Sequence, residues 1–255
     1  FHAYIGTDSG RPYSIFHKIN AVEHELAEFH QLMRSCSQDS VTTWKKWYRF
    51  PPRRQPLKMA VDEWGIWEYQ DPPYGTTNTY EWRHALATAC FLNTLLRCSD
   101  FVAMANWAQM VNILAPIMAN EQTSIRQTVF YPLREYRFHA LGEIVKTETT
   151  SPAVDGSLQA LNAVCTMRDQ GGELTIFVVN VSSQTVKASL SIDGQGSAFV
   201  KEVTTLTGDR LDAKNMLAKP EKDIVSMKTD KPGKRLRTVT FPPESIQILS
   251  IIPPK

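Results

Sequence analysis

The chain has 255 residues, of which 42% are hydrophobic and 21% charged. This is the composition of a folded protein, and the length suffices for two domains of ordinary size. Its 28 basic and 26 acidic residues leave a formal net charge of +2, which gives no electrostatic reason to expect nucleic acid or an anionic membrane as a partner. No apolar run reaches the roughly 18 residues that a membrane span needs, so no membrane partner is expected.

The start of the chain and its cysteines bear on where the protein works. Phe1–Ile5 lacks the basic leader and the long apolar stretch of a signal peptide, and we expect a processed subunit or a fragment. Cys90 and Cys98 would lie about 12 Å apart on one helix, too far for a disulfide. Free thiols favour a cytoplasmic location slightly over secretion, although the sequon at Asn180 points weakly the other way. The localisation stays open.

Residues 1–135 alternate strand-like and helix-like segments. The predicted order is a strand, a helix, a strand, a helix and a strand, at Phe1–Ile5, Ile15–Met33, Leu57–Val61, Thr79–Arg97 and Phe101–Ala105. A proline-rich loop at 50–56 and a loop of about a dozen residues around Pro72–Gly75, the length of a functional lid, connect them. Such crossovers build parallel sheets. Three strands cannot close a barrel, so the sheet should have open edges that another segment covers.

From about residue 140 the pattern changes to short alternating segments separated by turn residues. The predicted strands are Leu174–Val179, Lys187–Ile192, Ala198–Thr205, Thr238–Phe241 and Ile246–Ile251, with turns at 171–172, 193–194, 208–209 and 242–243. Regular short strands of this kind are typical of an antiparallel β-sandwich. The fold class is therefore α/β plus all-β, with an α/β domain over 1–138 and a sandwich domain over 139–255.

The most distinctive segment is Met59-Ala-Val-Asp-Glu-Trp-Gly-Ile-Trp67. An apolar strand runs into Asp62 and Glu63, with Trp64 and Trp67 around them. This suits carbohydrate chemistry, because a carboxylate attacks or stabilises an anomeric carbon while an indole packs on the sugar ring. Successive strand side chains point to opposite faces, so the two acids should not form a catalytic pair. The alternative is the solvated start of a helix with half-buried tryptophans.

Other polar side chains lie at predicted strand ends. His2 and Tyr4 would share one face of the first strand, and a tyrosine hydroxyl aimed at a carboxylate helps to keep it ionised. Asn106 and Gln109 follow the third strand, where amides can hydrogen-bond sugar hydroxyls. The alternative roles are packing or capping for the first pair, and loop structure or helix capping for the second.

A metal centre is not expected. His24 and His30 are six residues apart, whereas two helical ligands of one metal ion should be four apart. No glycine-rich phosphate loop, nucleophile elbow or Cys/His pairing occurs in the sequence, so no cofactor is expected either.

Four motifs in order resemble the C-terminal half of family 51 α-L-arabinofuranosidases: His2-x-Tyr4, Val61–Trp67, Ala105–Ile117 and Arg126–Pro132. The resemblance implies that residues 1–138 are the last part of a (β/α)8 TIM barrel and that a jelly-roll-like β-sandwich follows. It also implies cleavage of terminal α-L-arabinofuranosyl groups with retention of configuration. Gly65 stands where many relatives carry Asn.

The resemblance implies a role for individual residues. Glu63 matches the nucleophile at the end of the seventh barrel strand, and Tyr4 matches the tyrosine that hydrogen-bonds it. Gln109 matches a glutamine that contacts sugar hydroxyls, and Trp67 an aromatic side chain beside the scissile bond. Three further candidates near the strand ends are His2, Trp64 and Asn106.

The family's general acid/base, a Glu on the fourth barrel strand, has no counterpart here. Retaining chemistry needs two carboxyl groups about 5–5.5 Å apart. We therefore expect a separate N-terminal chain that carries this Glu, and a higher oligomer, with arabinan, arabinoxylan and oligosaccharides all open as substrates. The alternatives are another retaining barrel glycosidase, acting on xylosides or glucans, and a non-catalytic carbohydrate-binding or assembly subunit.

Overall fold

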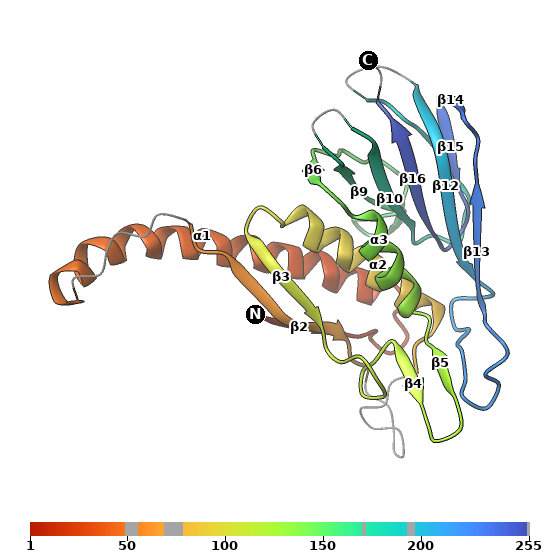
Figure 1. The fold of residues 1–255 in the computed structure, drawn as a ribbon, viewed down its shortest axis with the longest axis horizontal. Coiled ribbons are helices and arrows are strands. Elements are labelled where there is room, and N and C mark those ends of the chain that lie inside the picture. The colour runs from red at the N-terminus through yellow and green to blue at the C-terminus, as the bar shows by residue number, and fades with distance from the viewer. Residues whose placement is uncertain (49–55, 69–78, 170–171, 193–196, 254–255) are drawn as a thin grey trace.

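The computed structural model describes residues 1–48, 56–68, 79–169, 172–192 and 197–253. A small parallel sheet with its helices forms one part, and a larger antiparallel sheet stands beside it (Figure 1). The expected lid around 72–75 lies outside the described residues. So do most of the proline-rich loop at 50–56, the turn at 193–194 and the first residue of the turn at 171–172.

The parallel sheet has the strand order β1–β2–β3, with β1 at His2–Ile5, β2 at Met59–Ile66 and β3 at Val102–Trp107. Helix α1 (Ser14–Tyr48) follows β1, and α2 (Trp82–Arg97) follows β2. A hairpin of β4 (Ile117–Ala119) and β5 (Ser124–Arg126) and helix α3 (Phe130–His139) complete this part. The predicted parallel strand–helix units are confirmed.

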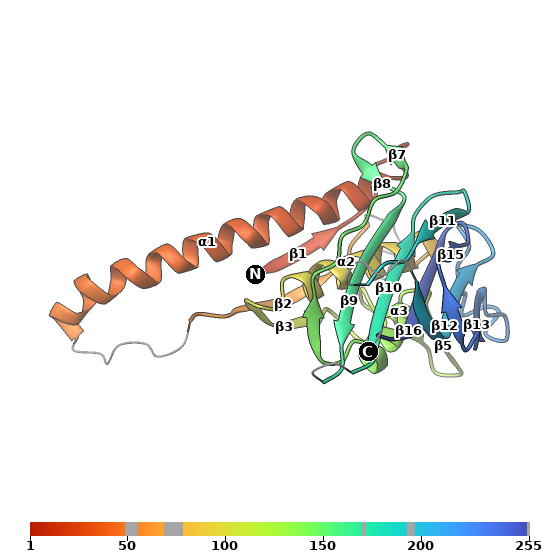
Figure 2. The same ribbon diagram turned by 90° about the horizontal axis from the view of Figure 1, so that it is seen from above.

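Two elements extend further than the sequence pattern indicates. The strand predicted to end at Val61 continues to Ile66, because β1 pairs with its second half from His2 opposite Glu63 to Ile5 opposite Ile66. Both acids of the central motif are therefore strand residues. Helix α1 also continues past its apolar stretch and projects beyond the rest of the molecule (Figure 2).

Helix α2 is buried between the two sheets. It contacts β2 on one side and β9, β10 and β16 of the antiparallel sheet on the other. Twelve of its residues are buried, which explains why small and apolar side chains cover almost its whole circumference rather than one stripe. Its first N–H groups, which have no partner inside the helix, are bound from outside: the amides of Trp82 and Arg83 donate to the carbonyls of Ala213 and Leu211.

The antiparallel sheet has seven strands. Six follow the order β13–β12–β16–β10–β9–β6, and β14 also pairs with β12. Their bounds are β6 Glu143–Val145, β9 Leu161–Met167, β10 Leu174–Asn180, β12 Ala198–Gly208, β13 Val225–Asp230, β14 Lys234–Leu236 and β16 Ser245–Ile252. Two separate pairs are β7 (Ala153–Asp155) with β8 (Leu158–Gln159) and β11 (Val186–Ser189) with β15 (Thr238–Phe241).

Alternation along β10 gives the large sheet two apolar faces. Phe177 and Val179 belong to the hydrophobic core that includes α2 and the parallel sheet. Val178 points the other way, into a second core with Val186 and Phe241 from the β11–β15 pair. The first core therefore crosses the predicted boundary at 138/139, which falls at the end of α3.

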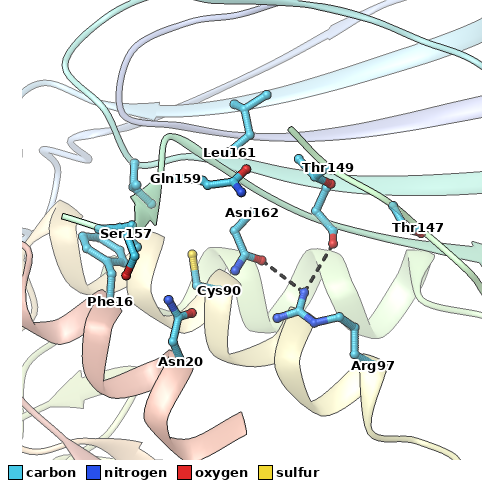
Figure 3. A pocket seen from close by; sticks show the side chains of 13 residues that line it. Phe16, Asn20, Cys90, Arg97, Thr147, Thr149, Ser157, Gln159, Leu161 and Asn162 are labelled. Carbon is cyan, nitrogen blue, oxygen red and sulfur yellow. Dashed lines mark hydrogen bonds between the residues drawn. The ribbon is translucent and has the colours of Figure 1, made fainter. Parts of the chain in front are cut away.

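Arg97 makes a polar joint between the helices and the large sheet. Its guanidinium binds Glu23 of α1 at 2.5 Å and donates to Asn162 Oδ1 at 3.4 Å and to the Ala163 carbonyl at 3.3 Å, both in β9. Burial raises the pKa of the Glu23 carboxyl, but the hydrogen bonds and charge of Arg97 outweigh it, so the net shift is downward. Arg97 and Asn162 line a pocket of about 290 Å³ at this joint, outside the parallel sheet (Figure 3).

Candidate active site

Tyr4 and Glu63 meet at the exposed face of the parallel sheet. The hydroxyl of Tyr4 donates a hydrogen bond of 2.9 Å to Glu63 Oε2. Burial, and after it the hydrogen bond to Glu63, raise the pKa of Tyr4 to about 12. The phenol therefore stays protonated at any ordinary pH and acts as a donor to the carboxylate. The contact that the sequence predicted between a tyrosine and a carboxylate is present.

His2 contacts both acids of the motif. Its Nε2 lies 3.4 Å from Asp62 Oδ1 and its Nδ1 lies 3.5 Å from Glu63 Oε2. The side chains of Asp62 and Glu63 are 52% and 45% exposed. One imidazole therefore lies between the two acids, and the pairing of β2 with β3 shifts register in this part of the strand, between Val61 and Trp64. An irregularity of this kind re-aims side chains locally.

Trp67 forms an aromatic wall beside the Tyr4–Glu63 pair. Its ring lies edge-on to the Tyr4 ring at 5.4 Å and 83°, and 47% of the residue is exposed. Its amide donates to the Ile5 carbonyl at 2.8 Å, so it continues the pairing between β1 and β2. An exposed indole next to a carboxylate offers a surface on which the apolar face of a sugar ring can pack.

Trp64 does not stand around the carboxylate, contrary to the sequence expectation. It is 2% exposed, stacks on Phe91 of α2 at 4.7 Å and meets Trp107 of β3 edge-on at 5.0 Å. The β2 face that carries Trp64 packs on α2, so the indole belongs to the hydrophobic core.

Asn106 and Gln109 lie at the end of β3. Asn106 is the next-to-last residue of β3, and Gln109 lies two residues beyond the end of the strand. Both side chains are exposed. The indole of Trp107 donates to the Leu114 carbonyl at 2.9 Å, which ties down the segment that carries Gln109. Because β2 and β3 are parallel, these amides follow the same edge of the sheet as Glu63 and Trp67.

Two further polar residues at this edge, Glu68 and His84, were not among the residues predicted from the sequence. Glu68 Oε1 accepts hydrogen bonds from the Thr7 amide at 3.0 Å and from His84 Nε2 at 2.9 Å. His84 lies in the first turn of α2 and is 2% exposed. It is 16 residues from Glu68 in the sequence, and a lone histidine on a helix carries no pattern that identifies its partner.

Other chemistries find little support in the described ranges. No group of three or more His, Cys, Asp or Glu side chains there is arranged to hold a metal ion. Burial raises the pKa of Cys90 to about 12 and that of Cys98 and Cys165 to about 11, so these thiols are protonated and poor nucleophiles. Nor does any helix among the described residues have the length and hydropathy that crossing a membrane requires.

The fold thus consists of parallel strand–helix units with polar groups at the carboxyl ends of their strands, followed by an antiparallel sheet. This is the arrangement of the last part of a (β/α)8 barrel with an appended β domain. Residues 62–245 match the family described as the alpha-L-arabinofuranosidase C-terminal domain, and the chain belongs to this family. The correspondence to the C-terminal region of family 51 enzymes is thereby confirmed.

Individual relatives agree with this assignment. The probable alpha-L-arabinofuranosidase C of Aspergillus fumigatus is 27% identical over 212 residues, and the match covers 78% of this chain but 40% of the relative. The intracellular exo-alpha-(1->5)-L-arabinofuranosidase of Streptomyces lividans is 28% identical over 189 residues, covering 67% of this chain and 28% of the relative. This chain thus spans less than half the length of these curated relatives.

Solved structures show the same relation. The alpha-L-arabinofuranosidase from Thermotoga maritima, solved as an arabinose complex, is 25% identical with a TM-score of 0.77, covering 98% of this chain and 51% of that one. A family 51 alpha-L-arabinofuranosidase from Bifidobacterium longum has the same fold, with a TM-score of 0.70 at 24% identity, and is covered to 52%. The chain corresponds to about half of each structure.

Proposed function

We propose that this chain supplies the nucleophile of a retaining α-L-arabinofuranosidase, and that the nucleophile is Glu63. The observation that carries the proposal is the 2.9 Å hydrogen bond from Tyr4 to Glu63 beside the exposed ring of Trp67. The tyrosine fixes one carboxylate oxygen and leaves the other for attack on an anomeric carbon. Membership of the arabinofuranosidase family and the relatives' names support an arabinofuranoside as substrate.

The reaction would be a double displacement. One carboxylate oxygen of Glu63 forms a bond to the anomeric carbon. At the same time an acid protonates the departing glycosidic oxygen, which leaves with the bonding electron pair. The same acid, now a base, then takes a proton from water, and the water oxygen displaces Glu63 from the sugar. The product keeps the configuration of the substrate.

The acid/base glutamate of this mechanism would come from the N-terminal half of the barrel. The chain covers 40% of its Aspergillus relative and 51% of the Thermotoga structure, which is consistent with a need for that half. We propose that the enzyme is complete only with that half, that the barrel part of this chain ends at 138 and the sandwich domain begins at 139, and that the assembly is a higher oligomer.

The other site residues would bind the sugar. Trp67 would pack on the ring beside the scissile bond, whereas the exposed amides of Gln109 and Asn106 would hydrogen-bond its hydroxyls. His2, which touches both Asp62 and Glu63, would hold the two carboxylates apart from one another. A panel of aryl arabinofuranosides, xylosides and glucosides would establish which sugar the site accepts.

The test is the Glu63→Ala variant in the complete enzyme, with the N-terminal half present. Turnover of an aryl arabinofuranoside should fall to background while assembly, measured by light scattering, stays unchanged. Asp62→Asn is the matched control, because it changes the neighbouring acid and leaves the Tyr4–Glu63 pair in place; it should keep most of the activity. Near-normal turnover by Glu63→Ala would refute the assignment.

A further inference from the structure

Glu68 joins the segment after β2 to two other elements. One of its oxygens, Oε1, accepts from the Thr7 amide, just after β1, and from His84 Nε2 in the first turn of α2. Its neighbour Trp67 is bound through its own amide to the Ile5 carbonyl at the end of β1. The backbone that carries the exposed indole of Trp67 is therefore held by strand pairing on one side and by the Glu68 side chain on the other.

The hydrogen bonds of His84 determine which of its ring nitrogens carries the proton. The Glu81 amide donates to His84 Nδ1 at 2.9 Å, so that nitrogen presents a lone pair. The proton is then on Nε2, which donates to Glu68 at 2.9 Å. One imidazole thus caps the start of α2 and binds the carboxylate at the end of β2. Because His84 is 2% exposed, water does not replace either bond.

The surroundings of this contact are tightly packed. Tyr80 is 1% exposed, its hydroxyl donates to the Ile66 carbonyl at 2.7 Å, and its ring lies edge-on to His84 at 5.7 Å. A Cβ atom on Gly6 would lie 2.7 Å from the Trp67 carbonyl oxygen, so the end of β1 approaches Trp67 as closely as a glycine allows. Helix α2, itself fixed in the core, is therefore a rigid support for the segment that carries Trp67.

We propose that the Glu68–His84 pair is a clamp that positions Trp67 as the wall of the sugar site, with His84 and Glu68 as positioning residues that touch no substrate. The inference rests on the proposed function, because only an enzyme with Trp67 at its sugar site gains from such a clamp. The clamp couples the orientation of the indole to helix α2 rather than to the strand end alone.

Two substitutions at His84 distinguish its bond to Glu68 from its bond to the Glu81 amide at the start of α2. In His84→Asn the amide oxygen occupies the place of Nδ1, so the Glu81 amide keeps an acceptor while Glu68 loses its donor. In His84→Gln the side-chain nitrogen reaches the place of Nε2, so the bond to Glu68 is kept. Both variants are polar and of similar size, and both are made in the complete enzyme. Glu68→Ala removes the Glu68–His84 bond by changing Glu68, the more exposed of the two residues. It replaces His84→Asn in the test if that variant does not fold.

The first measurement observes Trp67 directly. Enzyme labelled with 5-fluorotryptophan gives one fluorine NMR signal for each tryptophan, six of them from this chain, and Trp67→Phe assigns the signal of Trp67. The Trp67 signal should shift or broaden in His84→Asn and in Glu68→Ala and should stay in place in His84→Gln. An unchanged Trp67 signal in His84→Asn, or equal changes in both His84 variants, would overturn the proposal.

The second measurement is kinetic. His84→Asn should lower kcat/KM for an aryl arabinofuranoside about 10-fold and His84→Gln less than about 3-fold, where a 10-fold loss corresponds to about 1.4 kcal/mol. In a Trp67→Ala background, the same His84→Asn change should cost less than about 2-fold, since its effect passes through Trp67. An equal loss in both backgrounds would show a general structural role instead. Should the unaltered enzyme not cleave arabinofuranosides at all, the proposed function fails, and the fluorine signal alone decides the clamp.

Discussion

Replacing Tyr4 by phenylalanine removes one hydroxyl and leaves the ring in place. In the native chain this hydroxyl donates to Glu63 Oε2 at 2.9 Å. A pKa of about 12 means that it donates throughout the working pH range. The edge-on contact of the ring with Trp67 at 5.4 Å does not involve the hydroxyl, so Tyr4→Phe should leave the fold and the aromatic wall intact.

The size of the effect follows from the kind of bond that is lost. A hydrogen bond to a charged group contributes about 1.5–3 kcal/mol. If the whole of this serves to hold Glu63 in its attacking orientation, kcat/KM falls about 10- to 150-fold, at 1.36 kcal/mol for each factor of ten. The assay is the hydrolysis of an aryl arabinofuranoside by the complete enzyme, with thermal unfolding measured on the same samples.

Tyr131→Phe is the matched control. Tyr131 also donates its hydroxyl to a carboxylate, that of Asp223, but in a pocket that the β4–β5 hairpin and α3 line together with residues 215–223. This variant should change kcat/KM less than about 3-fold. A Tyr4→Phe enzyme that loses no more activity than the Tyr131→Phe control would show that the hydroxyl does not orient the nucleophile.

Two further outcomes concern stability. Gly208→Ala should lower the free energy of unfolding by about 2 kcal/mol or more in urea titrations, because its Cβ would lie 2.4 Å from Cγ of the fully buried Trp82. Gly65→Ala is the control: its Cβ would lie 3.6 Å from its nearest neighbours, so the free energy of unfolding should change by less than about 0.5 kcal/mol. Equal effects of the two substitutions would contradict the packing described. Burial raises the pKa of Glu68, but the hydrogen bonds from His84 and Thr7 outweigh it and lower the pKa to about 2 from 4.5. Stability from this carboxylate is thus present above pH 4.5 and lost as the pH falls towards 2, up to about 3 kcal/mol; a Glu68→Gln variant whose stability falls equally between pH 4.5 and 2 would contradict this origin.

The parts of the structure that local pattern determines were predictable from the sequence. Apolar spacing identified the helices that became α1 and α2, and alternation identified strands such as β10, because both signals come from residues close together in the chain. The contact between Tyr4 and Glu63 was expected from the family resemblance, and the structure places the two residues on neighbouring parallel strands. At these positions the sequence indicates both the element and the face that it buries.

Other features depend on partners far along the chain. Trp64 follows Glu63 directly in β2, so alternation turns its ring to the opposite face, but only the structure shows that Phe91 of α2 covers that face. The register shift between Val61 and Trp64 arises from pairing with β3, which no pattern within β2 reveals. The bond between Glu68 and His84 joins a strand end to a helix start, and neither residue type indicates the other.

The chemical role of Glu63 is tested most directly by trapping. The complete enzyme is treated with a mechanism-based fluorinated arabinofuranoside, which forms the glycosyl-enzyme and then turns over slowly, and the labelled peptides are sequenced by mass spectrometry. The label should be on Glu63, with one sugar for each copy of this chain, and should be absent from the Glu63→Ala variant. A label on Asp62 or on the N-terminal half, or the absence of any label from an enzyme that is active on arabinofuranosides, would contradict the assignment of Glu63 as the nucleophile.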